Sequence, residues 1–132
     1  MKAAYGETEK ALVDVHLSKT SRFRCKSHTH SNADVVKRNV ESLRASISLH
    51  SQGEMLLTSW GYTSSLPDDN DELIRIGNAA AAAIESVNNR KYTVGPAGAV
   101  LYPAGGASDD FAKTAGVKFA VTVELPGGTD RS

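Results

Sequence analysis

The spacing of apolar residues along the chain predicts three amphipathic helices. Residues 7–17 gather their apolar side chains on one side and predict a short helix. Residues 33–44 have apolar positions at i, i+4 and i+7, which favours a second helix packed on a sheet. Residues 68–89 predict a longer helix, because Asp68 is a suitable N-cap and an Asn-Asn pair ends the pattern. The predicted apolar face of this long helix consists of Leu73, Ile76, Ala80, Ala83, Ile84 and Val87.

Four other segments have the pattern of β-strands. Residues 45–50 alternate between apolar and small or polar side chains, and residues 55–57 form a short apolar run. Residues 99–102 predict a third strand, and residues 117–125 are almost continuously apolar, as in a sheet covered on both faces. Strands that alternate with helices predict an α/β fold with a mixed, largely parallel sheet flanked by helices.

Residues 18–39 interrupt this pattern. They carry several Lys and Arg side chains together with His28 and His30, and they show no apolar periodicity before Val35. Such a composition is typical of a loop or a poorly ordered segment. Histidines two positions apart can chelate a metal ion on a strand, but the surrounding cations would repel it, so we expect solvated loop histidines here.

Composition narrows the class of protein. The chain has 132 residues, 40% of them hydrophobic and 23% charged, which suits one globular domain. Fifteen basic and fifteen acidic side chains give no net charge, so nucleic acid and anionic membranes are not expected partners. No apolar run is long enough to span a bilayer, and the first residues show no signal peptide. The single cysteine, Cys25, leaves no internal disulfide to form.

Two strand ends and one turn carry candidate chemistry. His50 directly follows an alternating strand, where catalytic groups of α/β proteins commonly lie, although a hydrogen-bonded structural histidine also fits. Glu124 closes an apolar strand, a setting that suits a general base as well as a solvated strand end. Asp109 and Asp110 follow a glycine turn. Adjacent carboxylates in a turn indicate that one caps the backbone and the other faces a cation, unless the turn is simply solvated.

Taken together, four segments resemble the zinc metallocarboxypeptidases of the carboxypeptidase A and B type, over the C-terminal part of their catalytic domain. The segments are Ile-Ser-Leu-His-Ser at 47–51, Trp-Gly-Tyr-Thr at 60–63, Leu-Tyr-Pro-Ala-Gly-Gly-Ala-Ser-Asp-Asp-Phe at 101–111 and Val-Thr-Val-Glu-Leu at 121–125. The separations of His50 from Tyr102 (102 − 50 = 52) and from Glu124 (124 − 50 = 74) look like those of the family. The resemblance implies an incomplete carboxypeptidase-like fold.

The resemblance also implies a role for each matching residue. His50 corresponds to a zinc ligand, and Glu124 to the base that deprotonates the water attacking the scissile carbonyl. Tyr102 matches the tyrosine that closes over the C-terminal carboxylate of the peptide. Asp109 lies where the family carries its specificity residue, and an aspartate there implies removal of C-terminal Lys or Arg.

The sequence departs from the family in its first part. It contains no His-x-x-Glu, the motif that supplies two zinc ligands, and no matching Asn-Arg pair for the substrate carboxylate. Gln52 stands where the family usually has a tyrosine. We therefore divide the chain into residues 1–39, a poorly matching segment with a short helix and a basic loop, and residues 40–132, a partial peptidase catalytic domain.

These features predict a zinc-dependent carboxypeptidase of truncated form, weakly active or inactive, which would act on peptide or protein C-termini. One retained zinc ligand is too few to hold the metal firmly. The family implies an extracellular protein. Two alternatives remain open at this point: a non-catalytic module that binds basic peptide C-termini, and a chain that does not fold on its own because its sheet lacks neighbouring strands.

Overall fold

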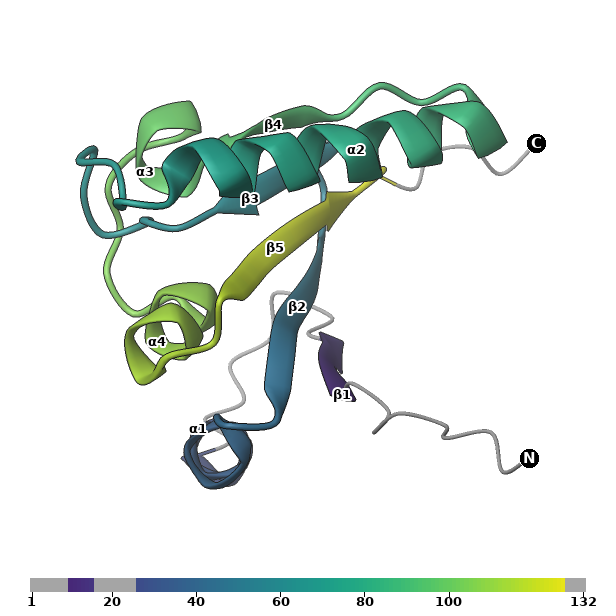
Figure 1. Ribbon diagram of the computed structural model, residues 1–132. Coiled ribbons are helices and arrows are strands. Elements are labelled where there is room, and N and C mark those ends of the chain that lie inside the picture. Colours follow the sequence, from purple (N-terminus) through teal and green to yellow (C-terminus); the bar gives the residue numbers. More distant parts are fainter. Residues whose placement is uncertain (1–9, 16–25, 128–132) are drawn as a thin grey trace, which may run out of the picture.

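A computed structural model describes residues 10–15 and 26–127, with side chains over residues 33–127, as one sheet with helices on both faces (Figure 1). The strands are β1 (Lys10–Val15), β2 (Leu43–Ser51), β3 (Met55–Thr58), β4 (Thr93–Pro96) and β5 (Phe119–Leu125). The helices are α1 (Lys26–Asn39), α2 (Asn70–Asn88), the short α3 (Ala97–Val100) and α4 (Ser108–Ala115).

Within the described ranges, five strands form a mixed sheet in the order β1-β2-β5-β3-β4. The pairs β1/β2, β2/β5 and β3/β4 are parallel, and only β3/β5 is antiparallel. The carboxyl ends of β1, β2 and β5 therefore meet at one edge. Although β2 and β3 are joined by a short turn, β5 lies between them, so this turn crosses the carboxyl end of β5. The α/β fold with a mixed, largely parallel sheet is confirmed.

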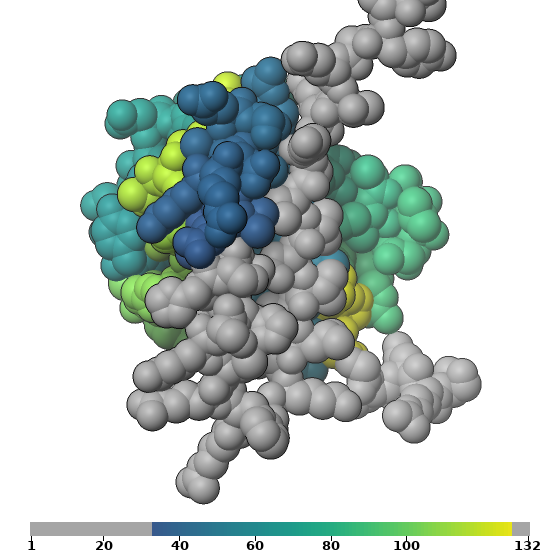
Figure 2. Space-filling view, turned by 90° about the horizontal axis from the view of Figure 1, so that it is seen from below, coloured from purple at the N-terminus to yellow at the C-terminus, as the bar shows by residue number. Residues whose placement is uncertain are grey.

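Helices cover both faces of the sheet. On one face α2 packs over β3 and β4 through Leu73 and Gly77. On the other face α4 packs on β5 and β2, and α1 packs against α4. The view from below shows the described side chains of α1, in blue, next to α4, in yellow-green (Figure 2). The core on that second face consists of Val36, Leu43, Ala112, Val117 and Ala120. Val117 and Ala120 are completely buried, so the short connection from α4 to β5 is fixed by packing.

Three predicted strands are confirmed. Residues 45–50 lie in β2, residues 55–57 in β3, and residues 119–125 form β5. The long helix is confirmed as α2, with Asp69 rather than Asp68 at its N-cap. Its predicted apolar face is partly wrong, because Val87 is 85% exposed while Gly77 is buried against the sheet.

The prediction for the first part of the chain is wrong in its described residues. Residues 10–15 form β1 and not a helix, because backbone pairing with β2 overrides a weak local apolar pattern. Residues 26–39 form α1 and not a loop, whereas residues 18–25 and the side chains of His28 and His30 lie outside the description. The helix predicted over 33–44 ends at Asn39, since Leu43 already begins β2.

One predicted strand is wrong, and one short helix was not predicted. Residues 99–102 are not a strand. The strand β4 lies before them at Thr93–Pro96, and the single helical turn α3, at Ala97–Val100, follows β4 directly. The pairing of β4 with β3 decides this position, because an apolar run of this length fits a strand or a short helical segment equally well. The pattern also missed α4, whose eight residues are too few for a clear helical period.

Candidate active site

His50 and Glu124 lie side by side at the edge where the parallel strands end. They are directly opposite in the register of β2 and β5, and residues opposite each other share a face of the sheet. The distance between His50 Nδ1 and Glu124 Oε1 is 3.5 Å. The Glu124 side chain is 15% exposed and the His50 side chain 34%, so the pair is shielded but reachable. Two such groups can hold a proton and transfer it to a bound ligand.

The turn between β2 and β3 closes over Glu124. The backbone N–H of Gly53 donates a hydrogen bond to the Leu125 carbonyl over 3.1 Å, next to Glu124 in the chain. A Cβ atom at Gly53 would lie 3.2 Å from Glu124 Cβ, so the turn packs directly on the glutamate side chain. Met55 lies opposite Glu124 in the register of β3 and β5, so Glu124 has a neighbour on each adjacent strand.

Asp110 caps backbone groups of a distant loop. Its carboxylate accepts hydrogen bonds from the N–H of Gly61 at 2.9 and 3.0 Å and from the N–H of Tyr62 at 2.9 Å. Gly61 in turn accepts a hydrogen bond at its carbonyl from the N–H of Ala104, over 2.8 Å. The Asp110 carboxylate thus ties the loop after β3 to α4, and the Gly61 carbonyl ties the same loop to the loop that carries Tyr102. The expectation that one member of the Asp109–Asp110 pair caps the backbone is confirmed.

Asp109 is buried on the sheet face that also carries Glu124. It is 4% exposed, and it accepts hydrogen bonds from the Asp110 N–H over 3.0 Å and from Thr122 Oγ1 over 3.3 Å. Thr122 lies two positions before Glu124 on β5, so both side chains point to the same face. Burial, and next the charge of Asp110, raise the pKa of Asp109. Among the described side chains no cation pairs with Asp109.

A buried hydroxyl without a partner lies on the same face. Ser48 is opposite Thr122 in the register of β2 and β5, and it is 4% exposed. Among the described residues its Oγ has no hydrogen-bond partner. Because leaving a buried hydroxyl unbonded costs about 1–3 kcal/mol, the polar group formed by Ser48, Thr122 and Asp109 is suited to complete its hydrogen bonds with a ligand or water.

Tyr102 stands apart from these residues. It lies in the loop between α3 and α4 and is 71% exposed, beside the exposed Leu101. The structure therefore brings His50, Glu124 and Asp109 to one face of the sheet and leaves Tyr102 on a surface loop. The sequence did not single out Ser48 or Thr122, although their period of two with His50 and Glu124 was a usable signal.

The described residues do not by themselves form a zinc site. A catalytic zinc needs three protein ligands and an open position. Over residues 33–127, the part of the chain with described side chains, no three His, Cys, Asp or Glu side chains come close enough to hold a metal ion. Within this part of the chain, His50 and Glu124 supply only two of the three ligand side chains that a metal ion would need. The structure also has no helix, within its described ranges, that is long and apolar enough to cross a membrane.

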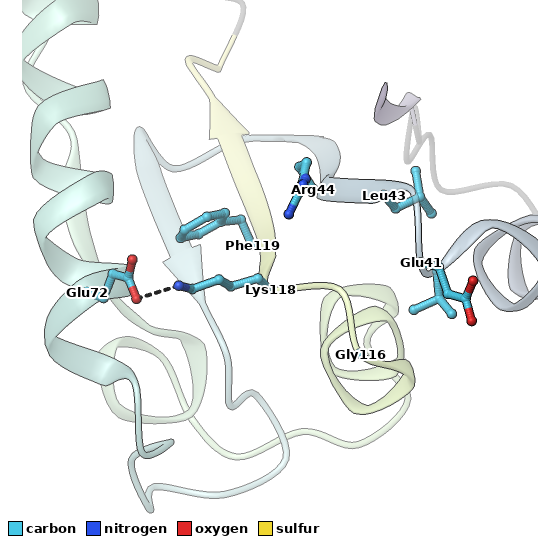
Figure 3. A pocket seen from close by; sticks show the side chains of 8 residues that line it. Glu41, Leu43, Arg44, Glu72, Gly116, Lys118 and Phe119 are labelled. Carbon is cyan, nitrogen blue, oxygen red and sulfur yellow. Dashed lines mark ion pairs between the residues drawn. The ribbon is translucent and has the colours of Figure 1, made fainter. Parts of the chain in front are cut away.

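An open cavity of about 490 Å³ lies elsewhere, at the amino ends of β2 and β5 (Figure 3). It is lined by Val40, Glu41, Leu43, Arg44, Glu72, Gly116, Lys118 and Phe119. Lys118 and Glu72 form an ion pair of 2.9 Å across it. Phe119 is five positions before Glu124 along β5, or about 16 Å at about 3.3 Å per residue, so this cavity is separate from the His50–Glu124 edge.

Known proteins resemble this chain in sequence. The family profile described as zinc carboxypeptidase matches residues 6–131. Carboxypeptidase B of Rattus norvegicus is 34% identical over 97 residues, which cover 74% of this chain and 23% of the rat protein. Carboxypeptidase B2 of Mus musculus is 39% identical over 94 residues, which cover 70% of this chain and 22% of the mouse protein. The chain thus spans about a quarter of the length of these relatives.

Solved structures resemble it in fold. Bovine thrombin-activatable fibrinolysis inhibitor, solved in complex with tick carboxypeptidase inhibitor, aligns with a TM-score of 0.72 and 31% identity, over 76% of this chain and 34% of that one. Carboxypeptidase A from Helicoverpa armigera aligns with a TM-score of 0.72 and 30% identity, over 80% of this chain and 27% of that one. The resemblance in sequence and the resemblance in fold point to the same group of proteins.

Proposed function

Since this chain belongs to the zinc carboxypeptidase family, we propose that its candidate active site serves the removal of C-terminal residues from peptides, with a preference for Lys or Arg. In this proposal His50 is a zinc ligand and Glu124 takes the proton from the attacking water. Tyr102 contacts the C-terminal carboxylate of the peptide, and Asp109 selects the side chain. The four roles rest on the family motif. The shared sheet face of His50, Glu124 and Asp109 supports the arrangement of those three residues.

The environment of Asp109 is the observation that supports the preference for a basic residue. This carboxylate is buried, has no cationic partner among the described side chains, and accepts a hydrogen bond from Thr122, whose register partner on β2 is Ser48. An ammonium or guanidinium group that reached it would favour its charged form and lower its raised pKa. An apolar side chain in the same place would leave a buried carboxylate without compensation.

We further propose that the isolated chain releases C-terminal residues slowly or not at all. The described residues provide His50 alone as a family zinc ligand, and a single histidine holds zinc weakly compared with three ligands. The binding alternative, capture of basic C-termini without catalysis, uses the same Asp109 environment and is separated from catalysis by the experiment below.

Binding and turnover are tested with two peptides that differ only in their last residue, Arg or Leu. Calorimetry is expected to give at least about tenfold tighter binding of the Arg peptide, because a hydrogen bond between charged groups contributes about 1.5–3 kcal/mol. Asp109→Asn should remove this difference, whereas Asp68→Asn, at an exposed aspartate before α2, should keep it. Equal affinities for the two peptides in the unaltered chain would contradict the proposed preference.

Metal analysis after desalting, combined with an assay for released arginine, tests the activity. We expect less than one zinc per chain and no measurable release. Stoichiometric zinc with measurable release would overturn the proposal of weak activity. Saturable binding of the Arg peptide without any turnover would favour the binding module.

The proposed partners are peptide or protein C-termini, and the proposed compartment is extracellular, both by analogy with the family. Fractionation of cells that express a tagged chain, with its complete natural upstream sequence, checks the compartment. Tagged protein confined to the cells would contradict it.

A further inference from the structure

The turn between β2 and β3 has an uncommon backbone conformation at a charged residue. Glu54 has a φ of 53°, in the left-handed region that favours glycine or asparagine. A glutamate in this region costs of order 1 kcal/mol or more in backbone free energy. Its presence at this position indicates that the side chain contributes something that glycine could not.

The Glu54 side chain fastens the turn to the segment after α2. Its carboxylate forms an ion pair with the guanidinium of Arg90, and both side chains are partly exposed. The Glu54 carbonyl also accepts a hydrogen bond from the N–H of Thr93, the first residue of β4, over 3.0 Å. The turn is thus attached on its outer side to the Arg90–Thr93 segment.

On its inner side the same turn contacts the strand that carries Glu124. The Gly53 N–H binds the Leu125 carbonyl, and the Gly53 backbone leaves no spare room beside Glu124. A shift of the turn by a few tenths of an ångström would therefore alter the space that confines the Glu124 side chain. His50 is the penultimate residue of β2, just before this turn. The position of the Glu124 side chain relative to His50 therefore depends on the position of the turn.

We propose that Glu54 and Arg90 are positioning residues, whose ion pair holds the β2–β3 turn against the end of β5 and so keeps the Glu124 carboxylate beside the His50 imidazole. The use of this arrangement in peptide cleavage rests on the proposed function, whereas the positioning is a property of the folded chain and is tested without turnover.

The test compares nuclear Overhauser effects between the His50 ring protons and the Glu124 side-chain protons, at constant pH, in the 132-residue chain. Arg90→Gln and Glu54→Gln should weaken or abolish this signal and shift the His50 ring resonances. Arg90→Lys, which keeps the charge, should retain most of the signal. Circular dichroism establishes that each variant is folded.

Glu54→Gly separates positioning from stability. Glycine relieves the backbone strain at this φ, so this variant should fold at least as well as Glu54→Gln, yet it should lose the His50–Glu124 signal. Lys113→Gln is the matched control, because it breaks an ion pair with Asp69 between α4 and the start of α2. It should lower stability and leave the signal intact.

The proposal is overturned if folded Arg90→Gln and Glu54→Gly chains keep the His50–Glu124 signal, or if Lys113→Gln weakens it to the same extent. Neither result would affect the proposed function, which the peptide and zinc experiments test on other variants. Conversely, if the chain binds no basic peptide, Arg90→Gln is still expected to weaken the His50–Glu124 signal.

Discussion

Thr122 donates a hydrogen bond from Oγ1 to Asp109 Oδ2 over 3.3 Å, and so joins the first turn of α4 to β5, the strand that carries Glu124. The two residues are thirteen positions apart in the sequence. Because Thr122 and Glu124 share a sheet face, the hydrogen bond fixes Asp109 relative to the candidate catalytic edge. Replacements around this contact should therefore change both stability and ligand preference.

Stability should depend on pH through Asp109. Its folded-state pKa is raised, by burial first and then by the charge of Asp110, so the folded chain disfavours the ionised form. The free energy of unfolding should fall as pH rises from the ordinary carboxyl pKa, about 3.9, through the raised folded value, at about 1.4 kcal/mol per unit of difference. Asp109→Asn should flatten this part of the profile, as measured by urea unfolding between pH 4 and pH 8.

A matched control is Asp71→Asn, at an exposed position in the first turn of α2. It should leave the pH dependence of the unaltered chain in place. If Asp109→Asn and Asp71→Asn give parallel profiles, Asp109 is not the source of the slope.

Removal of the Asp110 carboxylate should destabilise the chain. Asp110→Ala leaves the buried N–H of Gly61 without a partner and also releases Tyr62. We expect a loss of about 3 kcal/mol, since hydrogen bonds to charged groups contribute about 1.5–3 kcal/mol each. Asp110→Asn keeps one acceptor and should lose less. Ser108→Ala, at an exposed neighbour in α4, should change the unfolding free energy little, and an equal loss in all three variants would contradict this account.

Gly77 should not tolerate even a methyl group. A Cβ atom there would lie 2.5 Å from Cγ1 of Val94, a stiff β-branched side chain on β4. Gly77→Ala should therefore cost about 1–3 kcal/mol through overpacking, although alanine is the better helix former. Asn78→Ala, one position along on the exposed side of α2, should be neutral or stabilising. Thermal unfolding of the two variants side by side measures the difference.

Val117 should be the more sensitive of two valines that differ strongly in burial. It is completely buried in the core under α4, whereas Val87 near the end of α2 is 85% exposed. Val117→Ala should cost about 2 kcal/mol, since it leaves a cavity in a packed core. Val87→Ala should stay within about 0.5 kcal/mol of the unaltered chain. If chemical denaturation gives equal losses of unfolding free energy for the two variants, Val117 is not part of the stabilising core.

The sequence alone was sufficient for elements with long, regular patterns. Alternation over residues 45–50 and the apolar run over 117–125 identified β2 and β5, and helical spacing over 68–89 identified α2. Motifs in register placed His50 and Glu124 at the ends of two strands, and the fold then brought them together. Short segments were ambiguous, because 10–15 and 99–102 have too few residues for a period to be distinguished.

Residue order by itself therefore determined the fold class, the family motif and the candidate pair at the strand ends, since these depend on local periodicity and spacing. Only the tertiary structure decided that β5 lies between β2 and β3, that Asp110 binds the backbone at Gly61, and that Arg90 reaches the turn over Glu124. Arg90 and Glu54 are 36 positions apart in the sequence, and Asp110 and Gly61 are 49 positions apart. Such contacts form only when the strands pair and the whole sheet is buried.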